Sequence, residues 1–207
     1  FIQPFKLGGI DDRILPAQKL KIHTKNGLYP CVIGSKPPHV QKEDERKKVV
    51  AFDNLFIDVG ADSREDAINM GIAVGDPIAF DVQYTELCND KVMGKAFDNR
   101  AGCAVMVETM RLLKDIDCTV CAVGTVQEEV GLRGAAVAAF GVDPDVALAL
   151  DVTTSGDVPG VKETDTNIKM GKGPALTVTD SGLITHPKIL CWLQETANKE
   201  NIDIQLE

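Results

Sequence analysis

Short apolar runs separated by polar turn residues mark the first 87 positions of the chain. This spacing is typical of an all-β region, in which strands of about four to eight residues are bounded by turns. The dipeptide Asn26-Gly27 favours a tight hairpin between two of the runs. The expected strands are 20–22, 29–33, 55–59 and 78–82.

Two segments of this β-rich part break the strand pattern. Residues 63–70 follow Asp62 and are compatible with a short helix that stops at Gly71. Residues 35–48 are polar and contain two prolines and a cluster of charged side chains. We expect this second segment to form an exposed or partner-facing loop.

From about residue 89 the pattern changes to alternating strands and helices. The expected helices are 99–114, 132–140 and 188–198, and the expected strands are 118–126, 146–150 and 174–178. The strand candidates are nearly continuous apolar runs, which is typical of strands buried on both faces. Gly141 would stop the second helix, and Pro187 would start the third. This order predicts an α/β fold in three layers, with helices on both faces of a sheet.

The composition is that of an ordinary globular protein. The 207 residues allow one large domain or two small ones, and 44% of them are hydrophobic. The net charge of 22 − 31 = −9 argues against nucleic acid as a partner, because phosphate binding needs a basic surface. No apolar run is long enough to cross a bilayer, so no membrane partner is expected. The chain begins with Phe1, which indicates a piece of a longer polypeptide.

Six cysteines are scattered along the chain rather than grouped as in a disulfide scaffold. Because no secretory signal opens the sequence, this distribution predicts reduced thiols and a cytoplasmic protein. Cys118 and Cys121 form a Cys-x-x-Cys pair, but no second pair exists to complete a metal site. We expect both thiols to be buried and structural, since they open the apolar run at 118–126.

Acidic residues occur in three places where a predicted strand ends. Asp98 lies between a predicted strand end and a helix start. Glu128 and Glu129 follow one apolar run directly, and Asp151 closes the next. Ligands bind beyond the carboxyl ends of the strands in open α/β sheets, so the four side chains can share one rim. Clustered carboxylates repel one another unless cations lie between them, which is the arrangement that a pair of catalytic metal ions requires.

Each of these acidic residues also has a simpler interpretation. Asp98 could cap the following helix, since aspartate is favoured at that position. Glu128 and Glu129 could complement the dipole of the next helix, and Asp151 could belong to a solvated turn. Taken singly, each simpler interpretation is preferred. Taken together on one predicted rim, the four residues favour a site.

Motifs of several other enzyme classes are absent. The sequence has no Gly-x-x-x-x-Gly-Lys-Ser/Thr loop and no Gly-x-Ser-x-Gly elbow. A P-loop is therefore excluded, and an ordinary serine hydrolase is unsupported. The three histidines, His23, His39 and His186, show no ligand spacing. His186 precedes Pro187 and is better explained as the start of a helix than as a metal ligand.

Nine short segments together resemble one known family. The three that contain the acidic residues are 94–102 (GKAFDNRAG), 127–131 (QEEVG) and 149–152 (ALDV). The others are 8–11 (GGID), 14–16 (ILP), 21–25 (KIHTK), 33–39 (IGSKPPH), 156–161 (GDVPGV) and 171–174 (GKGP). They are similar to the tetrahedral aminopeptidases, also called deblocking or glutamyl aminopeptidases, which are dinuclear metallopeptidases often labelled endoglucanases. Nearly the whole chain is covered.

The resemblance implies a particular fold and assembly. The fold would be a three-layer α/β/α metallopeptidase core with an inserted small β-barrel-like domain. Residues 1–87 would form the inserted domain, which pairs subunits, and residues 88–207 would form the catalytic domain, incomplete at both ends. The family builds a hollow tetrahedral dodecamer, so a homo-oligomer that admits short peptides is implied.

The resemblance also implies a role for each acidic residue. Asp98 would bridge two divalent metal ions, Zn or Co, while Glu129 would bind one ion and Asp151 the other. Such a bridge holds two ions about 3.5–4 Å apart, close enough to share a water molecule. Glu128 would be the catalytic residue, a general base that accepts a proton from that water and then protonates the leaving amine. The implied function is a metal-dependent aminopeptidase.

The sequence departs from the family in its histidines. Each ion normally has a terminal histidine as well, one in a His-x-Asp motif upstream of the residue matching Phe1 and one downstream of the residue matching Glu207. None of the three histidines present is at a matching position. We therefore expect a middle fragment that binds zinc or cobalt poorly by itself. A non-catalytic fragment with an assembly or binding role, or an endoglucanase-type glycosidase, remain as alternatives.

Overall fold

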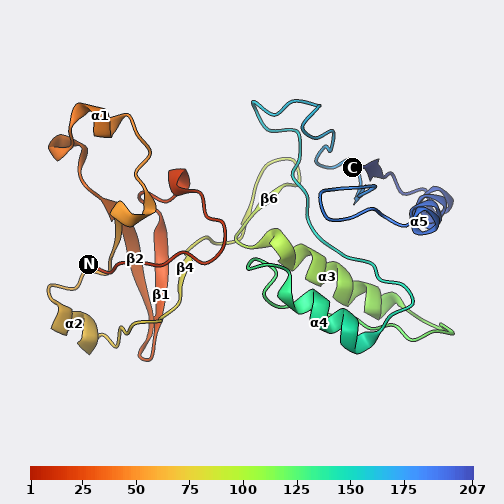
Figure 1. Ribbon diagram of the computed structural model, residues 1–207, viewed down its shortest axis with the longest axis horizontal. Helices are drawn as coiled ribbons and strands as arrows, with labels where there is room; N and C mark the ends of the chain where they lie inside the picture. Colours follow the sequence, from red (N-terminus) through yellow and green to blue (C-terminus); the bar gives the residue numbers. More distant parts are fainter. The chain divides into compact units, whose positions relative to one another are not determined.

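The computed structural model describes all residues, 1–207, and Figure 1 shows the course of the chain through its helices and strands. The chain divides into two compact units. The first unit comprises Phe1–Phe97 together with Met106–Leu148, and the second comprises Asp98–Val105 together with Ala149–Glu207. Each unit therefore combines segments that are far apart in the sequence. No helix in the structure is long and apolar enough to span a membrane.

A four-stranded antiparallel sheet forms the core of the first unit. Its strands are β1 (Lys19–Thr24), β2 (Gly27–Ser35), β3 (Leu55–Asp58) and β4 (Ile78–Phe80), in the order β3-β2-β1-β4. These strands confirm the four runs that the apolar pattern predicted. The expected hairpin also forms, because Thr24 pairs with Gly27 across the turn and the Thr24 hydroxyl accepts a hydrogen bond of 3.1 Å from the Asn26 N–H.

Alternating side chains of the sheet build one hydrophobic core. In β1 every second residue is buried, as expected for a sheet with one face inward. The core consists of Leu15, Leu20, Ile22, Cys31, Ile33, Leu55 and Ile57. The sheet is open, with the short strands β3 and β4 at its edges. The expected barrel-like closure is therefore not shown.

Short helical segments precede or connect the strands of the four-stranded sheet. α2 (Arg64–Asn69) begins where the sequence predicted, because the Ser63 hydroxyl accepts a hydrogen bond of 3.0 Å from the Asp66 N–H and caps the helix. The polar segment 35–48 is exposed over most of its length, as expected, and contains η2 (Pro38–Val40) and α1 (Glu43–Arg46). The other two are η1 (Asp12–Ile14) and η3 (Phe52–Asn54).

Lys6 and Asp12 form an ion pair, and both side chains also contact Phe52 in η3. The Lys6 ammonium lies 2.6 Å from Asp12 Oδ1, 3.1 Å from the Ile10 carbonyl oxygen and 5.0 Å from the centre of the Phe52 ring. Asp12 Oδ2 accepts a second hydrogen bond from the Phe52 N–H. The Lys6 ammonium first, and the Phe52 N–H second, hold the pKa of Asp12 below its ordinary value.

We expect Asp12→Asn to lower the thermal unfolding temperature by a few degrees at neutral pH, because the ion pair disappears. A carboxyl whose pKa is lowered in the folded state stabilises above its unfolded pKa of about 4, and that stabilisation is lost as the pH falls through the folded value. The difference in unfolding temperature between the variant and the parent protein should therefore become smaller below about pH 4. Circular dichroism melts across pH measure this.

The matched control for that substitution is Glu43→Gln. Glu43 pairs with Lys47 at 3.3 Å, but both side chains are strongly exposed, 87% and 75%. Exposed pairs of this kind contribute little to stability. Equal effects of the two substitutions would show that the Lys6–Asp12 pair is no more than a surface contact.

Two longer helices follow a small hairpin of β5 (Thr85–Glu86) and β6 (Val92–Met93). α3 spans Phe97–Leu112, but the backbone at Asp98 and Asn99 is not helical, so the regular helix starts after Asn99. α4 spans Arg133–Val142. It continues through Gly141, where the sequence predicted its end, and stops at Asp143 in the left-handed conformation.

The last helix and a parallel strand pair belong to the second unit. α5 (Pro187–Glu200) has proline at its first position, and His186 Nδ1 accepts a hydrogen bond from the Lys188 N–H. His186 thus begins a helix, as predicted. The run at 174–178 contributes only β7 (Ala175–Leu176), which pairs in parallel with β8 (Gln205–Leu206).

The two other predicted strands are wrong. Residues 118–126 and 146–150 are not strands in the structure and are exposed, with Val123 and Leu148 exposed by 41% and 52%. A strand requires a neighbour to complete its backbone hydrogen bonds. The apolar composition is suited to a sheet interior, but neither segment has a ladder partner here, so the three-layer sheet is not formed by these segments.

Candidate functional site

Asp98 lies at the irregular start of α3, in a stretch held by its neighbour Asn99. The peptide bond between the two residues is cis. Asn99 Oδ1 accepts a hydrogen bond of 2.9 Å from the Gly102 N–H, which caps the regular part of the helix. The capping role that the sequence allowed for Asp98 therefore belongs to Asn99. The carboxylate of Asp98 is exposed.

Glu128 and Glu129 lie in a tight loop that leads into α4. The Glu128 carbonyl oxygen accepts hydrogen bonds from the N–H groups of Gly131 and Leu132, at 3.0 and 2.9 Å. The Gly134 N–H donates to the Val126 carbonyl oxygen at 2.9 Å. A β-carbon at position 134 would lie 2.3 Å from that oxygen, so the loop closes only over glycine. Both glutamate side chains are exposed.

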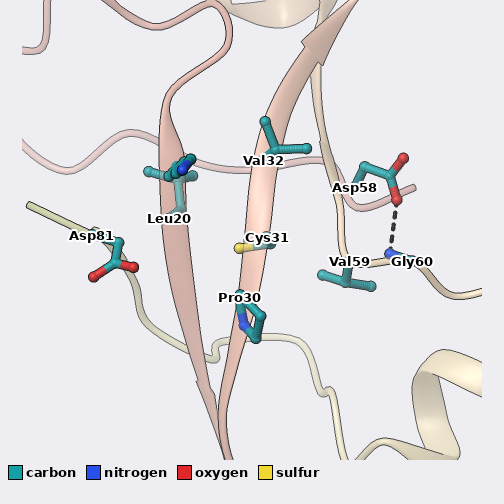
Figure 2. A pocket seen from close by; sticks show the side chains of 9 residues that line it. Leu20, Pro30, Cys31, Val32, Asp58, Val59, Gly60 and Asp81 are labelled. Carbon is teal, nitrogen blue, oxygen red and sulfur yellow. Dashed lines mark hydrogen bonds between the residues drawn. The ribbon is translucent and has the colours of Figure 1, made fainter.

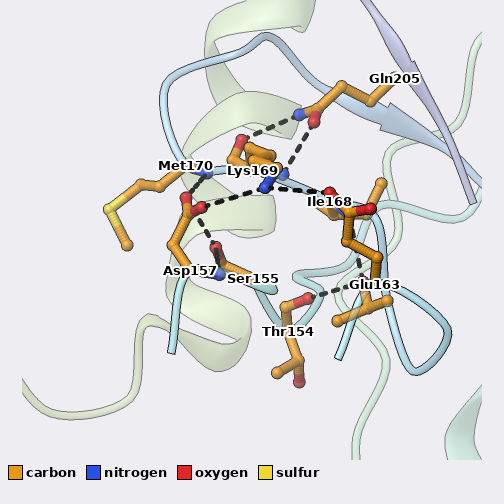
Figure 3. A network of polar contacts seen from close by, with 9 residues as sticks. Thr154, Ser155, Asp157, Glu163, Ile168, Lys169, Met170 and Gln205 are labelled. Atoms are coloured by element: carbon orange, nitrogen blue, oxygen red, sulfur yellow. Dashed lines mark hydrogen bonds and ion pairs between the residues drawn. The ribbon is translucent and has the colours of Figure 1, made fainter. Parts of the chain in front are cut away.

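Asp151 precedes a loop that is fixed by side-chain hydrogen bonds rather than by a strand ladder. Asp151 Oδ1 accepts a hydrogen bond of 2.8 Å from the Val152 N–H. Further along, Asp157 Oδ2 accepts from the Met170 N–H at 2.8 Å (Figure 3). Gln205 binds both backbone groups of Lys169, accepting from its N–H at 2.8 Å and donating to its carbonyl oxygen at 3.0 Å.

The structure links two of the four predicted site residues through their neighbours. Asn99 Nδ2 donates a hydrogen bond of 2.6 Å to the Leu150 carbonyl oxygen, so the residue after Asp98 is joined to the residue before Asp151. Asp98, Asp151 and the two residues that join them belong to the second unit. The other two predicted site residues, Glu128 and Glu129, belong to the first.

The carboxylates suit a divalent cation in kind, since carboxylate oxygens are ligands for hard and borderline divalent ions. The number of ligands in one place is too small, however. No group of three or more His, Cys, Asp or Glu side chains in the structure is arranged to hold a metal ion. The 207 residues thus provide oxygen donors for such a site, from segments that belong to two different compact units.

The histidines and cysteines do not add to the site. His23 lies on β1 and His39 lies in η2, and both are exposed. The predicted burial of Cys118 and Cys121 is wrong, because both are free and exposed. Their apolar run is not paired as a strand, and so nothing covers them. Cys31 is the buried thiol, and burial raises its pKa.

A pocket of about 650 Å³ lies in the first unit, at the sheet (Figure 2). Leu20, Cys31 and Val59 line it together with the carboxylates of Asp58 and Asp81. The Gly60 N–H donates to Asp58 Oδ1 at 2.8 Å. None of the four predicted site residues lines this pocket, so it offers no support for their chemistry.

Asn99 is the residue whose importance the sequence did not reveal. It lies inside the recognised segment 94–102, but no role was predicted for it. A local signal existed, because an asparagine three residues before Gly102 matches the spacing of a helix cap. The hydrogen bond to Leu150 had no such signal, since the two residues are separated by 51 positions.

Comparison with known proteins places the chain in one group. The family model for M42 glutamyl aminopeptidases matches residues 1–207. The whole chain is 35% identical to the lysyl aminopeptidase of Pyrococcus furiosus, of which it covers 59%. The chain thus spans less than two thirds of this relative.

Solved structures agree with this comparison and confirm the predicted α/β class. The aminopeptidase APDkam598 from the archaeon Desulfurococcus kamchatkensis is 45% identical, with a TM-score of 0.90 over 97% of this chain and 56% of that one. The Pyrococcus horikoshii TET1 peptidase is 32% identical, with a TM-score of 0.77 over 96% of this chain and 59% of the TET1 chain. That peptidase can assemble into a tetrahedron or a large octahedral shell. Since the family model matches every residue, the chain belongs to the M42 glutamyl aminopeptidase family.

Proposed function

We propose that this chain is part of a metal-dependent aminopeptidase that removes N-terminal residues from short peptides. The observation that carries the proposal is the family match over residues 1–207, which includes all four acidic positions. Relatives at 35% and 45% identity are named aminopeptidases. The hydrogen bond between Asn99 and Leu150, which joins the segments of Asp98 and Asp151, supports a shared site.

The four carboxylates divide into ligands and a base. Asp98 would be a ligand shared by two divalent cations, zinc or cobalt, and Glu129 and Asp151 would each be a ligand of one of them. When bound, the cations polarise the scissile carbonyl and make a nearby water molecule more acidic. Glu128 would accept a proton from water as that water attacks the peptide carbonyl, and would deliver the proton to the leaving amine. Histidine ligands for the cations would have to come from outside these 207 residues.

The two parts of the sequence serve assembly and catalysis. Residues 1–87 are the inserted domain of barrel-like type, and residues 88–207 belong to a three-layer α/β/α catalytic core. The inserted domain pairs subunits into a homo-oligomer, a dodecamer in its tetrahedral form. The P. horikoshii TET1 peptidase, which can assemble into a tetrahedron or a large octahedral shell, supports a homo-oligomer. The six free cysteines support a reducing, cytoplasmic location.

Amino-acid release from peptides tests the proposed activity. We expect the native protein to release the first residue from unblocked amino-acyl amides and dipeptides, and not from the same compounds with an acetylated amine. Dialysis against a chelator should remove the activity, and added Co²⁺ or Zn²⁺ should restore it. Chelator-resistant cleavage of cellulose oligomers would instead favour the glycosidase.

A further inference from the structure

The side chain of Asn99 uses both ends of its amide. Nδ2 donates to the Leu150 carbonyl oxygen at 2.6 Å, and Oδ1 accepts from the Gly102 N–H at 2.9 Å. Turning the amide over would set Oδ1 against a carbonyl oxygen and Nδ2 against an N–H group, so both bonds would be lost. The orientation of this side chain is therefore determined by its two partners.

The two bonds lie between the proposed ligand segments. Asn99 follows Asp98 directly, and Leu150 directly precedes Asp151. One amide therefore joins the start of α3 to a segment 51 positions away, and both belong to the same compact unit. This hydrogen bond, from the Asn99 side chain to the Leu150 backbone, limits how far the two neighbouring carboxylates can separate.

Gly102 shows how closely the two segments approach. A β-carbon at this buried position would lie 2.2 Å from Asn99 Oδ1 and 2.9 Å from the Leu150 carbonyl oxygen. Real β-carbons do not approach other atoms so closely, so the contact exists only because residue 102 is glycine. The helix start, the asparagine amide and the Leu150 carbonyl form one packed unit.

We propose that Asn99 is a positioning residue that sets the separation of Asp98 and Asp151, an inference that rests on the proposed metal-binding function. It touches neither substrate nor metal and acts through the backbone on each side of the site. Outer-sphere partners of this kind typically change metal affinity or activity by about 10–100-fold when they are removed.

A simple helix cap is the alternative role, and two substitutions separate it from positioning. Serine and aspartate cap helices about as well as asparagine. Asn99→Ser is too short to reach Leu150, and Asn99→Asp presents a carboxylate oxygen to the Leu150 carbonyl in place of a donor. Both variants keep an acceptor for the Gly102 N–H but lose the connection to Leu150. The neutral serine separates geometry from added charge.

Metal affinity of the native protein is the measurement, taken by competition with a chelator and followed by the visible absorption of bound Co²⁺. We expect Asn99→Ser to lower the affinity by about 10–100-fold and to alter the Co²⁺ spectrum, and Asn99→Asp to alter the spectrum as well. The thermal unfolding temperature without metal should change little. Ser63→Ala, which removes the cap of α2, is the control. It should affect stability but neither metal readout.

The outcomes distinguish this inference from the proposed function. If the unsubstituted protein binds no divalent metal, both are overturned. If it binds metal and Asn99→Ser changes neither the affinity nor the spectrum, Asn99 only caps the helix and the positioning role is rejected. Loss of affinity in Asn99→Ser equal to that in Ser63→Ala would also reject it.

Discussion

The 207 residues produced by themselves should bind Zn²⁺ or Co²⁺ at least about 100-fold more weakly than the native protein and should show little peptidase activity. The proposed site needs histidine ligands that the three histidines of these residues do not supply, and the four carboxylates are exposed to water. An ion held by one or two exposed carboxylates keeps most of its water and gains little from the protein. Metal affinity depends on a site that is already formed or that forms with the fold.

Calorimetric titration measures this difference, with the native protein as the reference and its intact mass and terminal sequences determined first. The same titration of an Asp98→Asn, Asp151→Asn double variant of the 207-residue chain gives the background from unrelated surface carboxylates. Tight binding of two ions by the unsubstituted chain alone would contradict the prediction. It would also mean that oxygen ligands suffice without histidine.

Glu128→Gln in the native protein should lower turnover by about 10²–10⁴-fold while metal affinity and KM change little. Glutamine has nearly the size of glutamate but cannot accept a proton, and positioned general bases contribute rate factors of that order. Steady-state kinetics on an amino-acyl amide, together with a metal-binding titration, measure these effects.

Glu129→Gln is the sharpest comparison, because the two glutamates are neighbours in the same loop before α4. If Glu129 is a ligand, its substitution lowers metal affinity, and excess Co²⁺ recovers part of the activity. Excess metal should not rescue Glu128→Gln. Glu108→Gln, on the exposed surface of α3, controls for a lost carboxylate. The reverse pattern, with metal rescue only of Glu128→Gln, would exchange the two roles.

The β-rich part of the fold was predictable because its signals are local. Alternating burial along β1 follows from a side-chain period of two, and Asn26-Gly27 lies at the hairpin that the sequence indicated. Ser63 and His186 cap the helices that they precede. In each case the interacting atoms are a few residues apart, so the sequence contains both partners within one short window.

For the candidate site, the sequence proposes residue types but not how they would be brought together. Asp98, Glu128, Glu129 and Asp151 stand out as acidic residues at the ends of apolar runs and within family-like segments. The connection between the segments of Asp98 and Asp151, made by the hydrogen bond from Asn99 to Leu150, joins residues 51 positions apart. Periodicity and propensity contain no information about such a pair.

Short-range chemistry along the chain is enough to specify its turns, its helix caps and the alternating faces of β1 and β2, and to reveal the family. Whether the apolar runs at 118–126 and 146–150 are strands was settled by the three-dimensional arrangement, in which neither has a ladder partner. Hydrophobicity favours burial without naming a neighbour, while a strand exists only when another backbone supplies the matching hydrogen bonds.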